Sequence, residues 1–161
     1  MNRSSACVAR DAVPGDGERV AELIAALAAH EGKPRATFTA ADFRRDAFGT
    51  RPRFRCVVAE ADAGVVGIAT WYPAYDATTA THGFHLLDLF VEEAVRGHGC
   101  GTALIRALAQ RAAKDGGRWI CLHVGPANAR AQNLYRRLGA TDLGLQFLAF
   151  DEDVFPGLAA G

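Results

Sequence analysis

Hydrophobic residues recur at two different spacings along this chain, and together they predict a mixture of helices and strands. Apolar positions from Val20 to Leu27 follow helical spacing, which predicts a helix over Glu18–Ala29 with Asp16 or Asp11 as its cap. Residues 86–91, in contrast, form a nearly continuous apolar run with one carboxylate inside it. Such a run is typical of a central strand that is covered on both faces.

The same reasoning, with glycine, proline and capping residues as boundaries, predicts ten elements along the chain. Thr39 is the expected N-cap of the second helix, and Asp62-Ala63-Gly64 the expected turn between two strands. Pro73 is expected to stop a strand, and residues 74–83 to form a loop. The expected strands are Cys7–Arg10, Arg55–Glu60, Val65–Tyr72, Phe84–Val91, Arg118–Val124 and Leu145–Phe150, and the expected helices are Glu18–Ala29, Ala40–Ala47, Gly101–Lys114 and Asn128–Leu138.

This order of elements predicts an α+β fold with a mixed sheet, in one domain that spans residues 1–161. Half of the residues are hydrophobic and 22% are charged, which is the composition of a folded globular protein. Lysine plus arginine equals aspartate plus glutamate at 18 each, so the net charge favours neither a nucleic acid nor a membrane as partner. No apolar stretch approaches the roughly 20 residues that a membrane span needs.

The four cysteines show no C-x-x-C pair, so their spacing predicts neither a zinc site nor a thioredoxin-like motif. Cys7, Cys56 and Cys121 lie in apolar, strand-like runs, where a buried thiol behaves as a small hydrophobic group. Free thiols fit a reducing compartment, so the prediction is a cytoplasmic protein without a metal.

A glycine-rich segment, Arg96-Gly97-His98-Gly99-Cys100-Gly101, joins the strand at 84–91 to the helix that follows it. Backbone N–H groups at the start of a helix attract anions, so the segment predicts a site for a phosphorylated cofactor. A P-loop would need a lysine before Thr102, and a dinucleotide loop would need G-x-G-x-x-G instead of the G-x-G-x-G found here. The pattern R/Q-x-x-G-x-G/A of acetyl-CoA-dependent N-acetyltransferases is satisfied, although a plain glycine-rich turn is the simpler alternative.

Five segments in order carry a resemblance to a known family: residues 27–31, 42–49, 71–76, 87–91 with the glycine loop, and 128–140. Over nearly its whole length the chain resembles the GNAT superfamily of N-acetyltransferases, and within it the spermidine/spermine and related small-amine acetyltransferases. The resemblance implies the GNAT fold, a mostly antiparallel sheet flanked by helices with splayed parallel strands at the cofactor site. It also implies acetyl-CoA as co-substrate and a homodimer.

The resemblance further implies where acetyl-CoA binds. The pantetheine arm would bond backbone groups near Phe90 and Val91, and Asn133 and Asn128 would bond the arm or orient the loop, with a helix cap as the equal alternative for Asn128. The pyrophosphate would rest on Arg96, Gly97, His98, Gly99, Cys100, Gly101 and Thr102.

Two residues match catalytic positions of the family. Tyr135 matches the tyrosine that protonates the leaving sulfur, and a phenol suits this role because its ordinary pKa near 10 keeps it protonated. An aromatic residue on the apolar face of a helix is the structural alternative. Asp88 matches an acidic position in the amine pocket, and a structural ion pair or an exposed edge position is its alternative.

The general base is left open by one departure from the family. Polyamine acetyltransferases carry a glutamate just before the aspartate, and this chain has Leu87 there. His85 is two residues away, on the same side of a regular strand, and imidazole titrates in the useful range. Asp88 acting through water, or no dedicated base, are the other two possibilities.

The remaining substrate residues are His30 and Glu31, with Glu31 as partner of a cationic tail, and Tyr72 and Tyr75 as pocket walls. Each also has an ordinary structural interpretation, as an exposed pair at a helix end or as strand and loop packing. The expected function is transfer of an acetyl group from acetyl-CoA to a primary amine of a small cationic metabolite, by direct attack in a ternary complex. The alternatives are a coenzyme-A-binding sensor without turnover, and an acetyltransferase that acts on a protein amine.

Overall fold

The protein is described here by a computed structural model that covers residues 7–160. Contacts divide the chain after Leu122 into two compact units, which are described separately. None of the helices in the described range is long and apolar enough to cross a membrane. The expectation of one domain over residues 1–161 stays a prediction.

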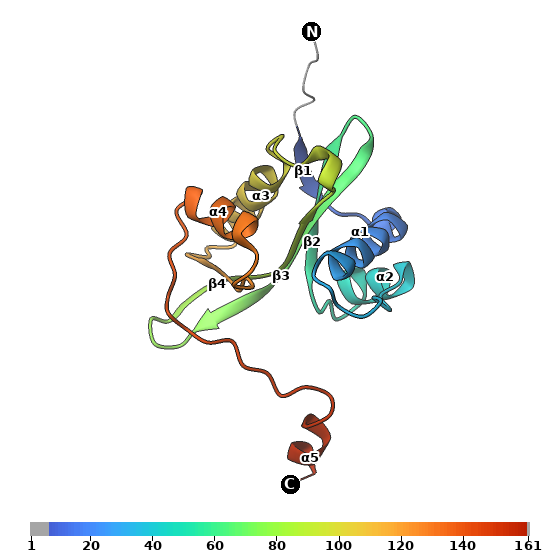
Figure 1. Cartoon of the computed structure of the whole chain (residues 1–161). Helices are drawn as coiled ribbons and strands as arrows, with labels where there is room; N and C mark the ends of the chain where they lie inside the picture. Colours follow the sequence, from blue (N-terminus) through green and yellow to red (C-terminus); the bar gives the residue numbers. More distant parts are fainter. Residues whose placement is uncertain (1–6, 161) are drawn as a thin grey trace. The chain divides into compact units, whose positions relative to one another are not determined.

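The first unit contains a five-stranded sheet in the order β1-β2-β3-β4-β5 (Figure 1). Neighbours are antiparallel from β1 to β4, and β4 and β5 run parallel. The sheet is therefore mixed and mostly antiparallel, as predicted. Its strands are β1 (Val8–Asp11), β2 (Arg55–Ala61), β3 (Gly64–Asp76), β4 (Thr81–Val91) and β5 (Ile120–Leu122).

Three helices cover the two faces of this sheet. Helices α1 (Gly17–His30) and α2 (Ala40–Phe48) lie on one face, and α3 (Cys100–Lys114) lies on the other (Figure 1). Val20 and Phe43 from the first two helices pack with Ile68 of the sheet, and all three are fully buried. Leu104 and Leu108 of α3 are fully buried as well. Burial of such side chains contributes roughly 1.5–3 kcal/mol each to folding.

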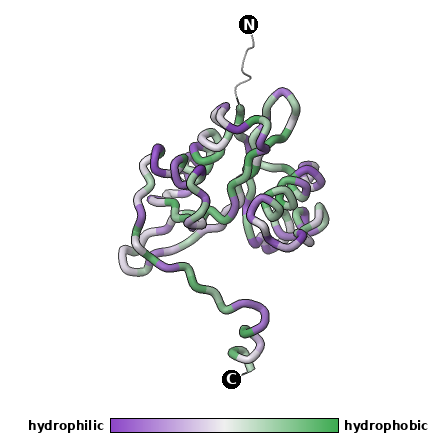
Figure 2. Tube along the Cα trace, viewed as in Figure 1, coloured by the Kyte–Doolittle hydropathy of each residue, from purple (hydrophilic) through white to green (hydrophobic). Residues whose placement is uncertain are grey.

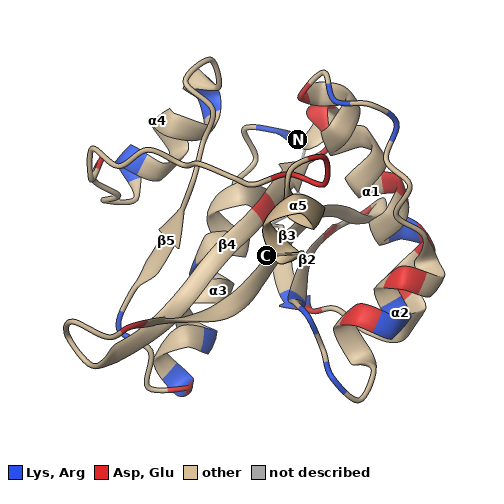
Figure 3. Ribbon diagram, turned by 90° about the horizontal axis from the view of Figure 1, so that it is seen from below, with Lys and Arg blue, Asp and Glu red and all other residues tan. Residues whose placement is uncertain are grey.

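The start of α2 confirms a local prediction. The Thr39 hydroxyl accepts a hydrogen bond from the Asp42 N–H at 3.2 Å, and the Asp42 carboxylate accepts from the Thr39 N–H at 3.0 Å. This reciprocal arrangement satisfies two backbone donors that the first turn of a helix leaves unpaired. Acidic and basic residues are interspersed along α2 (Figure 3), where Arg45 pairs with Asp42 and Asp46.

The predicted stop at Pro73 and the predicted loop over residues 74–83 are both wrong. Strand β3 continues through Pro73 to Asp76, and β4 already begins at Thr81. Pairing of β3 with β2 ends at Trp71, so beyond that residue β3 has a strand on one side only. A proline is tolerated there because its missing N–H costs no ladder hydrogen bond on the open side.

The second unit departs further from expectation. Helix α4 (Ala129–Arg137) falls within the predicted range, but the predicted strand Leu145–Phe150 is not formed and a short helix α5 (Phe155–Ala159) follows. Within the described residues no strand pairs with this segment, and an isolated strand has no backbone partners. This part of the trace contains hydrophobic stretches (Figure 2). Its large exposed apolar side chains are Leu143, Leu145, Phe147, Leu148 and Phe150.

The cysteines correct another expectation. Cys7, immediately before β1, forms a disulfide with Cys100, the first residue of α3. Cys7 is therefore not the free buried thiol that its apolar neighbours suggest. Cys56 and Cys121 are free. The disulfide joins residues 93 positions apart in sequence, a proximity that only the tertiary fold creates.

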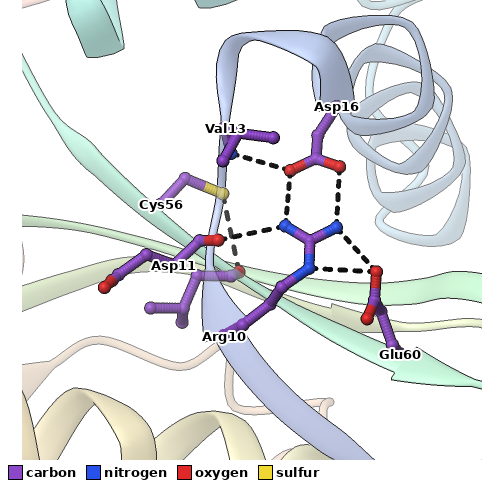
Figure 4. Close-up of polar contacts among 7 residues, drawn as sticks. Arg10, Asp11, Val13, Asp16, Cys56 and Glu60 are labelled. Atoms are coloured by element: carbon purple, nitrogen blue, oxygen red, sulfur yellow. Dashed lines mark hydrogen bonds and ion pairs between the residues drawn. The ribbon is translucent and has the colours of Figure 1, made fainter.

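A charged cluster connects β1, β2 and the entry to α1 (Figure 4). The Arg10 guanidinium donates two hydrogen bonds to the Asp16 carboxylate, at 2.8 and 2.9 Å, and two to the Glu60 carboxylate, at 2.6 and 3.0 Å. Asp16 also accepts from the Val13 N–H at 2.8 Å, and it makes no hydrogen bond to the helix that it precedes. The Arg10 hydrogen bonds hold the pKa of Asp16 below its usual value.

We predict that Asp16→Asn lowers the free energy of unfolding at pH 7 by about 1–2 kcal/mol, because it removes the charge that Arg10 binds. The folded-state pKa of Asp16 lies below its unfolded value. Its contribution is therefore present at neutral pH and is lost as the pH falls through that lowered pKa.

Urea unfolding at pH 7 and at pH 2–3 tests this prediction. The gap between the wild type and Asp16→Asn should close at the acidic pH, and the matched variant Asp153→Asn, at an exposed position, should show no gap at either pH. A gap of equal size at both pH values would contradict it.

Candidate functional site

The central irregularity of the sheet is a one-residue offset between β3 and β4. Thr70 pairs with Asp88 and Trp71 pairs with Leu86, so Leu87 is an extra residue without a partner on β3. Such a β-bulge interrupts the simple alternation of side chains along a strand. Leu87 and the following Asp88 consequently contribute to the same cavity, although they are neighbours in sequence.

This cavity has a volume of about 170 Å³ and contains one carboxylate among mostly apolar walls. The Asp88 carboxylate accepts a hydrogen bond of 2.5 Å from the hydroxyl of Thr70, which is 3% exposed. A partly buried anion in apolar surroundings attracts a cation more strongly than an exposed one does. We call it the Asp88 cavity; its lining is Val20, Ile24, Phe38, Phe54, Thr70, Leu87 and Asp88.

His85 of β4 pairs with Cys121 of β5, one position before the last residue pair between these two strands. Its ring stacks on Tyr72, with centroids 5.1 Å apart, and its Nδ1 lies 3.5 Å from the Cys121 sulfur. Burial raises the pKa of the Cys121 thiol, so the thiol stays protonated at neutral pH. His85 does not line the Asp88 cavity, although its partner Tyr72 and the Asp88 partner Thr70 lie on the same face of β3.

The four other predicted substrate residues lie at separate places in the fold. His30 ends α1 with its ring 6.4 Å from that of Phe90, and Glu31 pairs with Lys33 at 2.5 Å. Tyr72 is held against His85, as described. Tyr75 is 67% exposed and, three residues beyond Tyr72, points to the other side of the strand. None of these four lines the Asp88 cavity.

The glycine loop has the geometry that an anion site requires. Gly97 and Gly99 both have a φ of 88°, a conformation that L side chains rarely adopt, and a Cβ at either position would meet no atom within 4 Å. Gly99 is the N-cap of α3, and no side chain caps this helix. The first-turn N–H groups of Cys100, Gly101 and Thr102 therefore lack a side-chain acceptor from the N-cap residue. These residues fit a phosphate group.

Arg96 turns back toward the end of β4. Its Nε donates to the Val91 carbonyl at 2.8 Å, and its guanidinium lies 5.4 Å from the centroid of the Phe90 ring. Phe90 is buried, so its ring gives the Arg96 side chain a fixed contact at the entry to the loop. His98 is exposed, and its Nδ1 lies 3.3 Å from the Val95 carbonyl. The loop is thus tied to the strand that carries Asp88.

The second unit carries the three remaining predicted residues, all on or next to α4. Asn128 is the N-cap, and its side chain accepts from the Ala131 N–H at 3.0 Å, which fulfils the capping alternative. Asn133 is exposed. Tyr135 is the buried residue of this helix, and burial raises its pKa to about 12, so the phenol stays protonated through the whole neutral range.

Sequence reasoning missed five residues of the Asp88 cavity: Val20, Ile24, Phe38, Phe54 and Thr70. Thr70 carried a usable signal, since a hydroxyl in an apolar strand needs a hydrogen-bond partner. The two phenylalanines lie in irregular segments that periodicity does not cover. No group of three or more histidine, cysteine, aspartate or glutamate side chains in residues 7–160 is arranged to hold a metal ion.

Comparison with known proteins agrees with this geometry. The model of the acetyltransferase (GNAT) family matches residues 20–140. Thialysine N-epsilon-acetyltransferase of Bos taurus is 33% identical over 143 residues, which cover 83% of this chain and 84% of that protein. Spermidine/spermine N(1)-acetyltransferase-like protein 1 of Homo sapiens is 36% identical over 144 residues, or 83% of this chain but 20% of the longer human protein.

Solved structures show the same fold at lower sequence identity. An integron cassette protein from the mobile metagenome of V. cholerae has a TM-score of 0.80 at 19% identity, covering 97% of this chain and 99% of its own. An aminoglycoside acetyltransferase from an uncultured soil metagenomic sample has a TM-score of 0.76 at 17% identity, with 91% and 97% covered. The chain belongs to the GNAT acetyltransferase family. It has the GNAT fold, and it is an N-acetyltransferase enzyme.

Proposed function

We propose that this enzyme transfers an acetyl group from acetyl-CoA to the primary amine of a small, cationic metabolite, by direct attack in a ternary complex. The observation that carries the proposal is the position of Asp88, a carboxylate that the bulge directs into a small, mostly apolar cavity. The relatives named for thialysine and for spermidine/spermine support an amine with a second charged group.

The glycine loop supports acetyl-CoA as the donor. Two glycines with positive φ and an uncapped helix start present backbone N–H groups, which are suited to a pyrophosphate. Arg96 adds a positive charge at the entry of the loop. Bound acetyl-CoA would supply an activated thioester carbonyl. The protein would position the amine, and its side chains would remove a proton from the amine and donate a proton to the leaving thiolate.

Asp88 and His85 suit different parts of a diamine. A carboxylate stabilises the charged form of a nearby ammonium group, so we assign Asp88 to the second, unreactive ammonium group. The reacting amine must instead lose its proton before attack, which needs a group that titrates near neutral pH. We assign this role to His85, at the end of the paired part of β4 and β5.

Tyr135 is the proposed acid for the departing thiolate. Its role comes from the family resemblance, and its raised pKa of about 12 keeps its proton available at every pH at which the enzyme is expected to work. Asn128, which already caps α4, would then act by fixing the start of the helix that carries Tyr135.

We also propose that the enzyme is a homodimer. The exposed apolar side chains between Leu143 and Phe150 support it, since side chains of this type are usually covered in a stable protein. Sedimentation of the intact chain tests it, and a monomer at micromolar concentration would contradict it.

For location we propose the cytoplasm. Cys56 and Cys121 are free thiols, which are typical of proteins in a reducing compartment. The Cys7–Cys100 disulfide is not typical of such a compartment, because thiols are kept reduced there. The proposal therefore requires that this bond is reduced in the cell, which alkylation of the thiols in freshly quenched cells would reveal.

A panel of amines tests the proposed function through release of the free thiol of coenzyme A. Spermidine, putrescine, thialysine, lysine and an aminoglycoside are the candidates, and butylamine is the matched control for putrescine because it lacks only the second amine. We expect kcat/KM for the preferred diamine to exceed that for the equally long monoamine by about tenfold or more. Tight acetyl-CoA binding without thiol release for any amine would contradict the proposal.

Replacement of Tyr135 by Phe tests the acid. The phenyl ring keeps the packing of a buried side chain, so the fold should persist while kcat falls by about 100-fold or more. Because the pKa of Tyr135 is raised to about 12, the wild-type rate should not decline between pH 8 and pH 10 through loss of this proton. An unchanged rate in Tyr135→Phe would exclude the role.

A further inference from the structure

Thr70 places a hydroxyl group in the apolar middle of the sheet. It lies on β3, which runs between β2 and β4 (Figure 1), and its cross-strand partners are Cys56 and Asp88. Thr70 is 3% exposed, and its neighbours along the strand, Ala69 and Trp71, are buried hydrophobic residues. A hydroxyl group in such surroundings lowers stability unless it makes a hydrogen bond.

The hydroxyl of Thr70 makes this bond to the carboxylate in the Asp88 cavity. The distance between Thr70 Oγ1 and Asp88 Oδ2 is 2.5 Å. An ionised carboxylate can only accept, so the threonine is the donor. Both residues line the cavity, and its other lining residues are apolar. The bond therefore orders the one charged group that the cavity contains.

The Asp88 carboxylate retains an oxygen with which it can bind a substrate. Asp88 is half-buried, and it forms no ion pair with an arginine or lysine in residues 7–160. Each oxygen of an ionised carboxylate accepts hydrogen bonds. With Oδ2 bonded to Thr70, Oδ1 can accept from an ammonium group.

Thr70 also restricts the orientation of this carboxylate. Threonine is branched at Cβ, so its side chain has few rotamers on a strand, and the hydroxyl is a donor with a nearly fixed position. That donor favours the rotamers of Asp88 that keep Oδ2 against β3. A side chain that is ordered before the substrate binds loses less conformational entropy on binding.

The apolar surroundings argue against a purely structural role for the hydroxyl. Valine has nearly the shape of threonine, and in this place it would need no hydrogen-bond partner. Apolar groups of the same shape can replace a buried hydrogen-bonded pair with little effect on stability. The hydroxyl is instead explained by a carboxylate that must keep one orientation in the cavity.

We propose that Thr70 is a positioning residue for the acceptor amine. Its hydroxyl holds Oδ2 of Asp88 against β3, so that Oδ1 receives the second ammonium group of a diamine. This role rests on the proposed function, in which Asp88 binds that group. Thr70 acts through Asp88 and does not itself contact the substrate.

Steady-state kinetics of Thr70→Val and Thr70→Ser with putrescine and butylamine test this role. Thr70→Val keeps the shape of the side chain and removes the donor, so kcat/KM should fall about fivefold more for putrescine than for butylamine, mainly through KM. Thr70→Ser keeps the hydroxyl and should restore most of the preference for putrescine. Equal losses for the two amines, or a serine variant no better than the valine variant, would overturn the proposal.

Thr78→Val is the matched control. Thr78 also donates to an aspartate, Asp76, at 2.6 Å, but at an exposed position outside the Asp88 cavity. Its replacement should leave the ratio of kcat/KM for putrescine to that for butylamine unchanged. An equal fall of this ratio in Thr78→Val and Thr70→Val would count against a specific role of Thr70.

A double-mutant cycle tests whether Thr70 acts through Asp88. In an Asp88→Asn background, Thr70→Val should lower the putrescine-to-butylamine ratio no further, because the carboxylate that it positions is already absent. A further fall of the same size as in the wild-type background would overturn the proposal.

The wild type separates this proposal from the proposed function. A wild type that acetylates putrescine and butylamine equally well contradicts the role of Asp88 and, with it, that of Thr70. A wild type that prefers putrescine, with the preference retained in Thr70→Val, contradicts the role of Thr70 alone.

Discussion

The bulge at Leu87 shapes the Asp88 cavity, because it lets two residues that are neighbours in sequence line the same cavity. Without the extra residue, Leu87 and Asp88 would point to opposite faces of β4. With it, both line the Asp88 cavity, and the Thr70 hydroxyl stabilises the carboxylate from the adjacent strand. A buried anion needs such a partner, and it then attracts cations that the apolar walls alone would reject.

The same strand connects this cavity to the glycine loop. β4 ends at Val91, whose carbonyl accepts from Arg96, and the loop then passes through two glycines of positive φ into α3. The disulfide from Cys100 to Cys7 attaches the first turn of α3 to the start of β1. The Asp88 carboxylate and the glycine loop are therefore carried by one strand and its continuation, as the proposed transfer from an anionic donor to a cationic acceptor requires.

Local chemistry made much of this fold predictable. The capping box of Thr39 and Asp42, the helical spacing after Gly17 and the glycine loop all depend on residues within a few positions of one another. The predictions failed where residues distant in sequence determine the local structure. Pro73 is tolerated because β2 ends early, and the segment 145–150 forms no strand because no described strand pairs with it. Cys7 and Cys100 meet through the tertiary fold alone.

The candidate site was predictable to a similar degree. Asp88 was identified from the cost of a carboxylate in an apolar run, but its cavity depends on a bulge that the sequence pattern does not reveal. The unpaired Nε1 of Trp71 was not anticipated, since a missing hydrogen-bond partner can be recognised only after every neighbour has been placed.

The most direct measurement is the ratio of kcat/KM for putrescine to that for butylamine, in the wild type and in Asp88→Asn. If Asp88 holds the second ammonium group, the ratio should fall about tenfold or more in the variant, with butylamine turnover largely retained. An unchanged ratio would show that the carboxylate at the bulge does not bind the cationic end of the substrate.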